Sequence, residues 1–190
     1  MHYDLRTLIS TFFIRKNLIT NTLKKFILIF ILAGVSVYSK DIPKEFQELL
    51  DRGKLTFTPP TDMKLTEIIK DSLMRYDIAY KDSKNNFEIR VNILPLDSAD
   101  KYKENLDILS IAKEGSYKAI DMKPGLFNSD KAGTAEFEFD IVYGDSYKYG
   151  SVLFLYKDKC AVVYIFYLGA DKNTFVQQVI DNIFIVKFNK

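Results

Sequence analysis

Beyond residue 40, the apolar residues of the chain recur in short runs that are typical of strands and helices. Runs rich in aromatic and β-branched side chains predict strands, because these side chains favour the pleated, half-buried surface of a sheet. The predicted strands are 55–58, 75–80, 86–94, 132–143, 147–156, 160–168 and 183–188. Residues 63–69 fit a strand and a helix equally well.

Three segments have the signals of helices. Residues 43–52 begin with a proline in the first turn, and Gly53 ends the helix. Ser98 is a suitable N-cap for a second helix over about 98–113. Asp171 is the predicted N-cap of the last helix. The predicted buried stripe of this last helix consists of Phe175, Val176, Val179 and Ile180.

The predicted strands are of two kinds, and the difference predicts the architecture. Residues 152–155 and 161–168 are apolar at nearly every position, as expected for strands that are covered on both faces. Residues 87–94 and 132–143 alternate between apolar and polar positions, so one face of each lies nearer solvent. The turns that join the last three long strands are short enough to force antiparallel pairing. We therefore predict an α+β fold, a mostly antiparallel β-sheet flanked by helices in a three-layer α/β/α sandwich.

The first 39 residues have the three parts of a secretory signal peptide. Lys24 and Lys25 form a basic region, residues 26–37 are uncharged and mostly apolar, and small residues precede a cut after about Ser39. As a helix the apolar run extends about 18 Å, against about 30 Å for the hydrocarbon core of a bilayer. We predict a signal peptide over 1–39, a single α+β domain over 40–190, and a periplasmic or secreted location without stable membrane insertion after processing.

An uncleaved membrane anchor is the alternative interpretation of this segment. Residues 8–19 add a second apolar stretch before the lysines, which lengthens the apolar region. No cysteine lies near the predicted cut, so lipid attachment to a new N-terminal cysteine is excluded.

The charge of the chain bears on its partners. The 190 residues have a formal net charge of +2, but much of the positive charge lies in residues 1–39. Without the five basic residues and the one acidic residue of that segment, 22 basic and 24 acidic residues remain, a net charge of −2. A mildly acidic domain lacks the basic surface that binds phosphate backbones, so we predict no nucleic-acid partner.

The residue types needed for several catalytic arrangements are missing. Residues 40–190 contain no histidine, and Cys160 is the only cysteine, so Ser-His pairs, Cys-His pairs and imidazole ligation of a metal are excluded there. The chain also lacks a Gly-rich phosphate loop and a Gly-x-Ser-x-Gly elbow. We predict no cofactor and no enzymatic activity, with a carboxylate-pair hydrolase as an open alternative. Cys160 itself is predicted to be a small buried side chain.

Three acidic residues are candidate metal ligands. Glu136, Glu138 and Asp140 alternate along one predicted strand, so their carboxylates share one face of the sheet. Several oxygen ligands suit a hard divalent cation. The alternative is a solvated outer face, on which Arg90 and Lys148 from neighbouring strands pair with these carboxylates.

Candidate partner-binding residues lie in two places. The predicted loop 116–131 is long and carries mixed charges, which suits a recognition surface and equally a plain surface loop. Tyr143, Tyr147 and Tyr149 gather around one turn, where tyrosines with one polar end suit an interface. Cross-strand aromatic packing is the alternative for this cluster. The partner-binding candidates are Lys118, Asp121, Lys123, Tyr147 and Tyr149.

A resemblance to a known family rests on five segments, which are Leu55–Pro60, Tyr76–Tyr80, Phe87–Pro95, Gly133–Phe139 and Asn182–Phe188. They resemble the PsbP/Mog-type superfamily of α/β/α sandwiches, in particular its uncharacterised exported bacterial members. The resemblance covers most of residues 46–189 and implies that fold. Members of the superfamily include a photosystem subunit that supports an inorganic cluster and a nuclear-import factor that binds a small GTPase. The resemblance therefore also implies binding rather than catalysis.

These features together predict an exported, non-catalytic binding or assembly module. It is expected to act on a protein partner in the cell envelope, through a sheet face and the adjoining loops. The alternative is a small-molecule or divalent-cation binding protein, built on the acidic strand face or on the tyrosine cluster.

Overall fold

The computed structural model describes residues 42–68, 74–96, 112–143 and 146–190. The chain divides into two units, Met1–Asp41 and Ile42–Lys190, and the second contains all of these residues. The predicted signal peptide and nearly all of the predicted helix over 98–113 lie outside the described residues.

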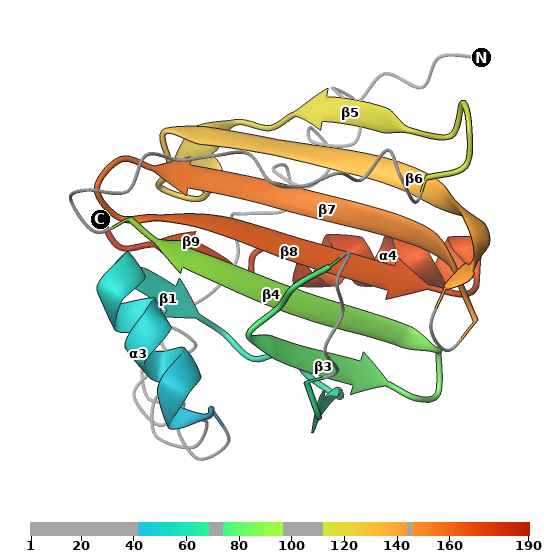
Figure 1. Ribbon diagram of the computed structural model, residues 1–190, viewed down its shortest axis with the longest axis horizontal. Helices are drawn as coiled ribbons and strands as arrows, with labels where there is room; N and C mark the ends of the chain where they lie inside the picture. Colours follow the sequence, from blue (N-terminus) through green and yellow to red (C-terminus); the bar gives the residue numbers. More distant parts are fainter. Residues whose placement is uncertain (1–41, 69–73, 97–111, 144–145) are drawn as a thin grey trace, which may run out of the picture. The chain divides into compact units, whose positions relative to one another are not determined.

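A seven-stranded antiparallel sheet forms the centre of the fold (Figure 1). Along the sheet the strands follow the order β2-β3-β4-β8-β7-β6-β5, and each pairs antiparallel with its neighbour. The strands are β2 (Lys64–Thr66), β3 (Ile78–Asp82), β4 (Phe87–Pro95), β5 (Lys118–Asp121), β6 (Lys131–Tyr143), β7 (Tyr147–Lys157) and β8 (Ala161–Gly169). The antiparallel sheet predicted from the short turns and alternating patterns is confirmed.

The remaining described elements are two helices, a 3₁₀ turn and a small second sheet. They are α3 (Lys44–Gly53), α4 (Lys172–Asn182), η2 (Pro124–Leu126), and the antiparallel strands β1 (Leu55–Phe57) and β9 (Val186–Phe188). Asp171 caps α4 as predicted, because its carboxylate accepts a hydrogen bond of 2.9 Å from the backbone N–H of Thr174. We call the pair β1 and β9 the β1–β9 ribbon.

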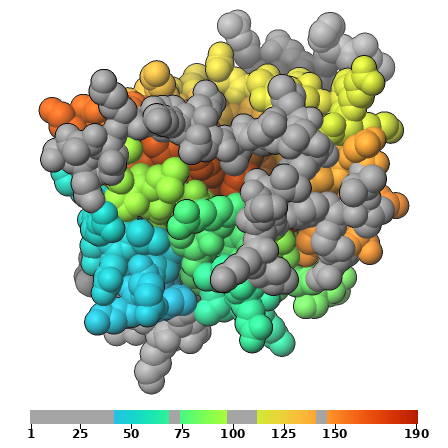
Figure 2. Space-filling view, in the orientation of Figure 1, coloured from blue at the N-terminus to red at the C-terminus, as the bar shows by residue number. Residues whose placement is uncertain are grey.

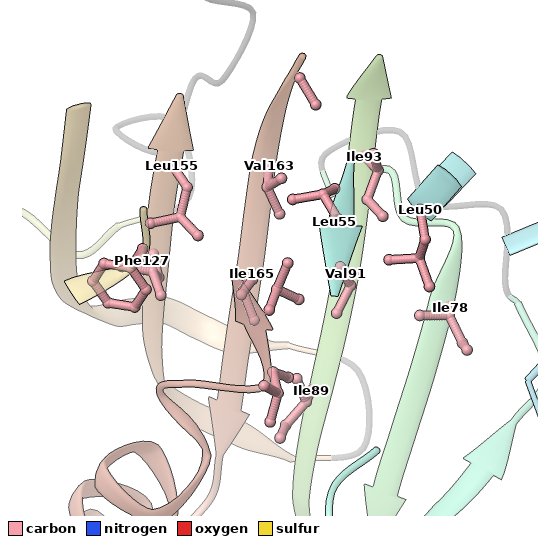
Figure 3. Packing of buried hydrophobic residues seen from close by; sticks show 14 of the residues in the cluster. Leu50, Leu55, Ile78, Ile89, Val91, Ile93, Phe127, Leu155, Val163 and Ile165 are labelled. Carbon is pink, nitrogen blue, oxygen red and sulfur yellow. The ribbon is translucent and has the colours of Figure 1, made fainter. Parts of the chain in front are cut away.

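One large apolar cluster joins these elements to the sheet (Figure 3). Phe87, Ile89, Val91 and Ile93 alternate along β4 and point into this cluster, as the sequence pattern predicts. The helix side chains that pack against them include Leu50 from α3 and Phe175 from α4. Both helices and the ribbon therefore lie against the same face of the sheet, which we call the helix face.

The prediction of a three-layer α/β/α sandwich is wrong. The described residues form a β-rich fold whose two helices pack on one face of the sheet. On the other face a second apolar cluster includes aromatic side chains of the strands themselves, among them Phe137, Phe139, Tyr164 and Phe166. Phe137 and Phe139 pack edge to face at 5.2 Å between ring centroids. A fully apolar strand such as β8 therefore does not by itself indicate a helix on each face.

Smaller differences concern three predicted segments. The predicted loop 116–131 contains β5 and η2. The C-terminal end of the predicted helix over 98–113 is not helical at Ala112, which forms an isolated antiparallel bridge with Phe139. In α4 only part of the predicted stripe is buried, since Phe175 is 6% exposed but Val176 is 47% exposed and Ile180 is 60% exposed.

Candidate functional site

One half of the helix face carries exposed side chains on β5 and β6. Across the sheet, Ile120, Thr134, Leu153 and Ile165 are consecutive cross-strand partners, so all four point to the same face. Because Leu153 and Ile165 belong to the cluster beneath the helices, Ile120 and Thr134 lie on the helix face too. The same reasoning places Lys118 and Glu136 there, through Ser151 and Tyr167.

Exposure along this face rises steeply toward the β5 edge. Ile165 and Leu153 are fully buried, whereas Ile120 is 37% exposed. Lys118 and Glu136 are exposed, and Thr134 is half-buried. We call the residues Lys118, Ile120, Thr134, Glu136 and Glu138 the open half-face. Figure 1 shows α4 behind the sheet at β8, on the other side of β7 from this open half-face.

Helix α4 reaches the open half-face at its first turn. At its first turn, Lys172 Nζ lies 4.0 Å from Glu138 Oε1 on β6 and 5.9 Å from the centre of the Tyr149 ring on β7. Just beyond its last turn, the Phe184 ring packs 5.3 Å from the Phe127 ring in the connection between β5 and β6. The first turn of α4 thus reaches β6 and β7, and the turn that follows the helix reaches the connection between β5 and β6.

An exposed apolar stripe lies between these two contacts. Val176 and Ile180 are four residues apart, which places them in one row along the helix, and Phe184 follows in the turn beyond α4. They are 47%, 60% and 45% exposed. We call Val176, Ile180 and Phe184 the α4 stripe. Its neighbours on the other side of the helix, such as Phe175, are buried against Phe87 and Tyr149.

The predicted metal ligands lie where the strand pattern places them, but they are not assembled into a metal site. Glu136 and Asp140 are exposed and Glu138 is half-buried, with buried phenylalanines between them. The pairing of β6 with β7 shifts register between Glu138 and Tyr143, so Asp140 lies in an irregular stretch. The residues that the structure describes contain no group of three His, Cys, Asp or Glu side chains able to hold a metal ion.

The alternative prediction, in which Arg90 pairs with the strand carboxylates on a solvated face, is wrong for Arg90. This residue is 5% exposed and lies opposite Phe166, on the face away from the helices. Its Nε donates to Glu88 Oε1 at 2.5 Å, and its guanidinium lies 4.7 Å from the centre of the Tyr76 ring. The charge that faces Glu138 instead is Lys172.

The two candidate tyrosines with described side chains differ in environment. Tyr147 is 1% exposed, and its hydroxyl donates a hydrogen bond of 2.8 Å to Glu88 Oε2. Tyr149 is half-buried, and its ring packs 6.2 Å from that of Phe175. Tyr147 is therefore part of the interior, while Tyr149 lies at the border of the open half-face. Tyr143 is placed by its backbone, which pairs with Tyr147.

The candidate residues of the predicted loop lie on or beside the edge strand. Lys118 and Asp121 are the first and last residues of β5, and all four residues of this strand are exposed. Figure 2 shows the atoms of β5, in yellow, at the rim of the face in view. Lys123 is exposed and precedes η2. The structure thus brings Lys118 to the open half-face and leaves Asp121 and Lys123 at its margin.

A buried polar cluster on β4 is a feature that sequence analysis missed. Glu88, Arg90 and Asn92 alternate with apolar residues, which suggested a polar face nearer solvent, yet they are only 5–6% exposed. Asn92 Nδ2 donates a hydrogen bond of 3.1 Å to Asp77 Oδ2, which also accepts one of 2.7 Å from the Ile93 backbone N–H. The signal in the sequence is the matched pair of opposite charges two positions apart, because buried charges require partners.

Burial changes the titration of Asp77. Desolvation raises the pKa of this carboxyl above 3.8, and the hydrogen bonds from Ile93 and Asn92 offset only part of the rise. Asp77 lies beside a strand end rather than among candidate catalytic groups. Its raised pKa therefore indicates a structural carboxyl and does not mark an acid–base site.

Two remaining features are the environment of Cys160 and the character of the described helices. Cys160 is 7% exposed and is a free cysteine in the main cluster, which confirms the predicted buried side chain. Among the helices that the structure describes, none has both the length and the apolar character needed to cross a membrane.

A scan of protein-family models, a search of curated proteins and a search of solved structures each found no match. The resemblance to the PsbP/Mog-type superfamily stays a prediction. The chemistry that the described site offers is therefore that of its own side chains, namely apolar contact along α4 and mixed charge on β5 and β6.

Proposed function

We propose that this chain is an exported, non-catalytic binding module that docks an amphipathic helix of a protein partner on its open half-face. The observation that carries the proposal is the α4 stripe, whose apolar side chains are exposed beside a part of the sheet that neither described helix covers. Export rests on the predicted signal peptide of residues 1–39, and a cell-envelope partner rests on that predicted location.

The dimensions of the open half-face suit one helix. Strands lie about 4.8 Å apart, so β7, β6 and β5 span about 10 Å between the first and the third. An α-helix with its side chains is about 10–12 Å wide. A partner helix laid beside α4 would therefore cover Ile120 and Thr134 and would contact the α4 stripe with its own apolar row.

The charges of the open half-face indicate what the partner helix carries. Lys118 lies directly opposite Glu136 on the neighbouring strand, and Lys172 lies 4.0 Å from Glu138. Positive and negative groups alternate here, so neither sign dominates. The partner helix is expected to be near neutral, with an apolar stripe bordered by acidic and basic side chains that pair with this pattern.

The proposal is tested by crosslinking in the cell from two positions. A photoreactive amino acid replaces Ile180 on α4 in one version and Ile120 on β5 in another, and the crosslinked peptides are identified by mass spectrometry. Both positions are expected to capture the same helical segment of the same envelope protein. The matched control is Lys84, an exposed residue in the turn between β3 and β4, which should capture neither.

A substitution on α4 tests the same surface by a second measurement, the recovery of the partner. Burying a large aliphatic side chain contributes about 1.5–3 kcal/mol, so Ile180→Asp should reduce recovery of the partner by about tenfold or more. Lys84→Asp should leave recovery unchanged. The proposal is wrong if the two probes reach only another part of this same chain or a second copy of it. It is equally wrong if they capture unrelated proteins, or if Ile180→Asp leaves recovery unaltered.

A further inference from the structure

A pocket on the outer side of the β1–β9 ribbon is separate from the open half-face. Thr56 and Lys187 are cross-strand partners, so both side chains point to the same side of the ribbon, opposite to Val186 and Phe188, which enter the core. With Phe184 they help to line a cavity of about 350 Å³. This volume is at the lower end of the range for small-molecule sites.

The walls of the pocket are fixed by backbone contacts. The Thr58 backbone N–H donates to the Ile185 carbonyl at 2.8 Å, which ties the end of β1 to the start of β9. On the other edge of β9, the Phe188 backbone N–H donates to the Phe127 carbonyl at 2.9 Å, and Asn128 Nδ2 donates to the Phe188 carbonyl at 2.8 Å. The pocket is therefore held from both edges of β9 rather than formed by a single loop.

The pocket has several hydrogen-bond donors. Its charged lining side chains are Lys187 and Lys190, and among the lining residues that the structure describes none has an acidic side chain. Lys187 Nζ lies 4.6 Å from the centre of the Phe184 ring, and among the described residues it has no carboxylate within ion-pair distance. A cation–π contact of this kind holds the ammonium above the ring while leaving its N–H groups available.

One hydrogen bond orients a further donor. The Thr56 hydroxyl donates to Asn189 Oδ1 at 2.6 Å, which leaves the Asn189 amide nitrogen as the group available to a ligand. The hydroxyl of Thr58 also lines the pocket. Ammonium, amide and hydroxyl groups around one cavity are the donors that a carboxylate accepts from.

We infer that this pocket binds a small organic anion in which a carboxylate is attached to a flat apolar group. Lys187, Asn189 and Thr58 donate to the carboxylate, and the flat group lies against the exposed ring of Phe184. A neutral molecule of the same shape is expected to bind more weakly, because its hydrogen bonds to Lys187 lack the second charge, and a cationic one is disfavoured by the lysine charges.

The test uses benzoate as the probe with the purified protein and no partner. Two-dimensional NMR is expected to show saturable shifts of the backbone amides of Thr58, Lys187 and Asn189 on titration. Benzamide, which has the same shape without the charge, should bind at least about tenfold more weakly, as expected when a charge-assisted hydrogen bond is lost.

Substitutions separate the two parts of the pocket. Lys187→Gln should weaken benzoate binding about tenfold, whereas Lys187→Arg should retain most of it and Lys84→Gln should change nothing. Phe184→Leu should weaken benzoate but leave the much weaker binding of acetate unaltered. Val176→Ala and Ile180→Asp, on the part of the α4 stripe outside the pocket, should have no effect. This result distinguishes the pocket from the proposed partner surface, with which it shares Phe184.

Three outcomes would overturn the inference. One is the absence of saturable shifts with benzoate in the millimolar range. Another is equal binding of benzamide and benzoate. The third is benzoate binding that Lys187→Gln leaves unchanged while the variant stays folded by its own NMR spectrum.

Discussion

The half of the sheet around β4 and β8 differs sharply from the half around β5 and β6, although one continuous hydrogen-bond ladder joins them. All nine residues of β8 are buried, and so are the first seven of β4. All four residues of β5 are exposed, and β6 alternates buried and exposed positions along its middle. The same strand geometry thus supports a packed interior at one side and an accessible surface at the other.

The difference separates the residues that stabilise the fold from those that are available for binding. Side chains of β4 and β8 contact α3, α4 and the β1–β9 ribbon, so their loss leaves a cavity. Side chains of β5 and the α4 stripe contact solvent over a large part of their surface. Changes in the second group are therefore expected to alter binding with little effect on stability.

The largest expected effect is on the free energy of unfolding, and a comparison of two isoleucines on the same face measures it. Ile165→Ala in β8 removes a fully buried side chain and should lower the free energy of unfolding by about 2–5 kcal/mol. Ile120→Ala in β5, at a position 37% exposed, should lower it by less than about 1 kcal/mol. Urea denaturation followed by circular dichroism measures both. Equal losses would show that the open half-face is packed as tightly as the interior.

A medium effect is expected from two glycines in adjacent strands. A Cβ atom at Gly150 in β7 would lie 2.5 Å from the ring of the buried Phe137, so Gly150→Ala should destabilise by about 1–3 kcal/mol. At Gly133 in β6 the nearest atom is the Ile120 carbonyl oxygen at 3.8 Å, and Gly133→Ala should change stability by less than about 0.5 kcal/mol. Thermal denaturation compares them, and a tolerated Gly150→Ala would mean that the Phe137 ring moves freely aside.

The smallest expected effect concerns the pH dependence of stability in the packed half. Burial raises the pKa of Asp77 above 3.8, so this carboxyl binds its proton more tightly in the folded protein than in the unfolded chain. The free energy of unfolding contains a contribution from proton binding to Asp77. This contribution is fully present below pH 3.8 and is lost as the pH rises through the raised pKa. Relative to the wild type, Asp77→Asn should therefore gain stability across that acidic window and show a constant difference at neutral pH.

Chemical denaturation at a series of pH values measures this difference. Asp121→Asn on exposed β5 is the matched control, because it removes one carboxylate from the open half without touching the hydrogen bonds to Ile93 and Asn92. An Asp77→Asn difference that stays flat through the acidic range would show that burial does not set the titration of Asp77.

Much of the sheet could be predicted from the sequence because its patterns are local. The apolar row at residues 87, 89, 91 and 93 and the cap at Asp171 depend on neighbouring residues, and both are confirmed. The expectation that the polar positions of this strand lie nearer solvent is wrong, because those side chains are buried. The three-layer arrangement was wrong because it depends on which face a distant segment covers. A strand that is apolar at every position shows that both faces are dry, but it does not show which elements cover them.

The candidate site was predictable only in part, for the same reason. The sequence places Glu136 and Glu138 on one face, and the register agrees. It assigned Lys118 to a loop, whereas the structure places it in β5 opposite Glu136. It did not reveal that Val176 and Ile180 remain exposed, because an apolar row on a helix normally indicates a buried stripe. It also did not reveal that Arg90 lies in the interior, since its pairing with Glu88 and Tyr76 requires the fold.

The short length of β5 has a consequence for how the protein behaves at high concentration. A long, flat, exposed edge strand recruits the edges of other molecules and leads to aggregation. Strand β5 is only four residues long and has a charged residue at each end. Beyond β5 the same edge of β6 is partly paired, because the Lys113 backbone N–H donates to the Glu138 carbonyl at 2.7 Å and Ala112 bridges Phe139. The β5 edge of the sheet is thus poorly suited to edge-to-edge polymerisation. The open half-face beside it can therefore stay exposed without promoting aggregation through this edge.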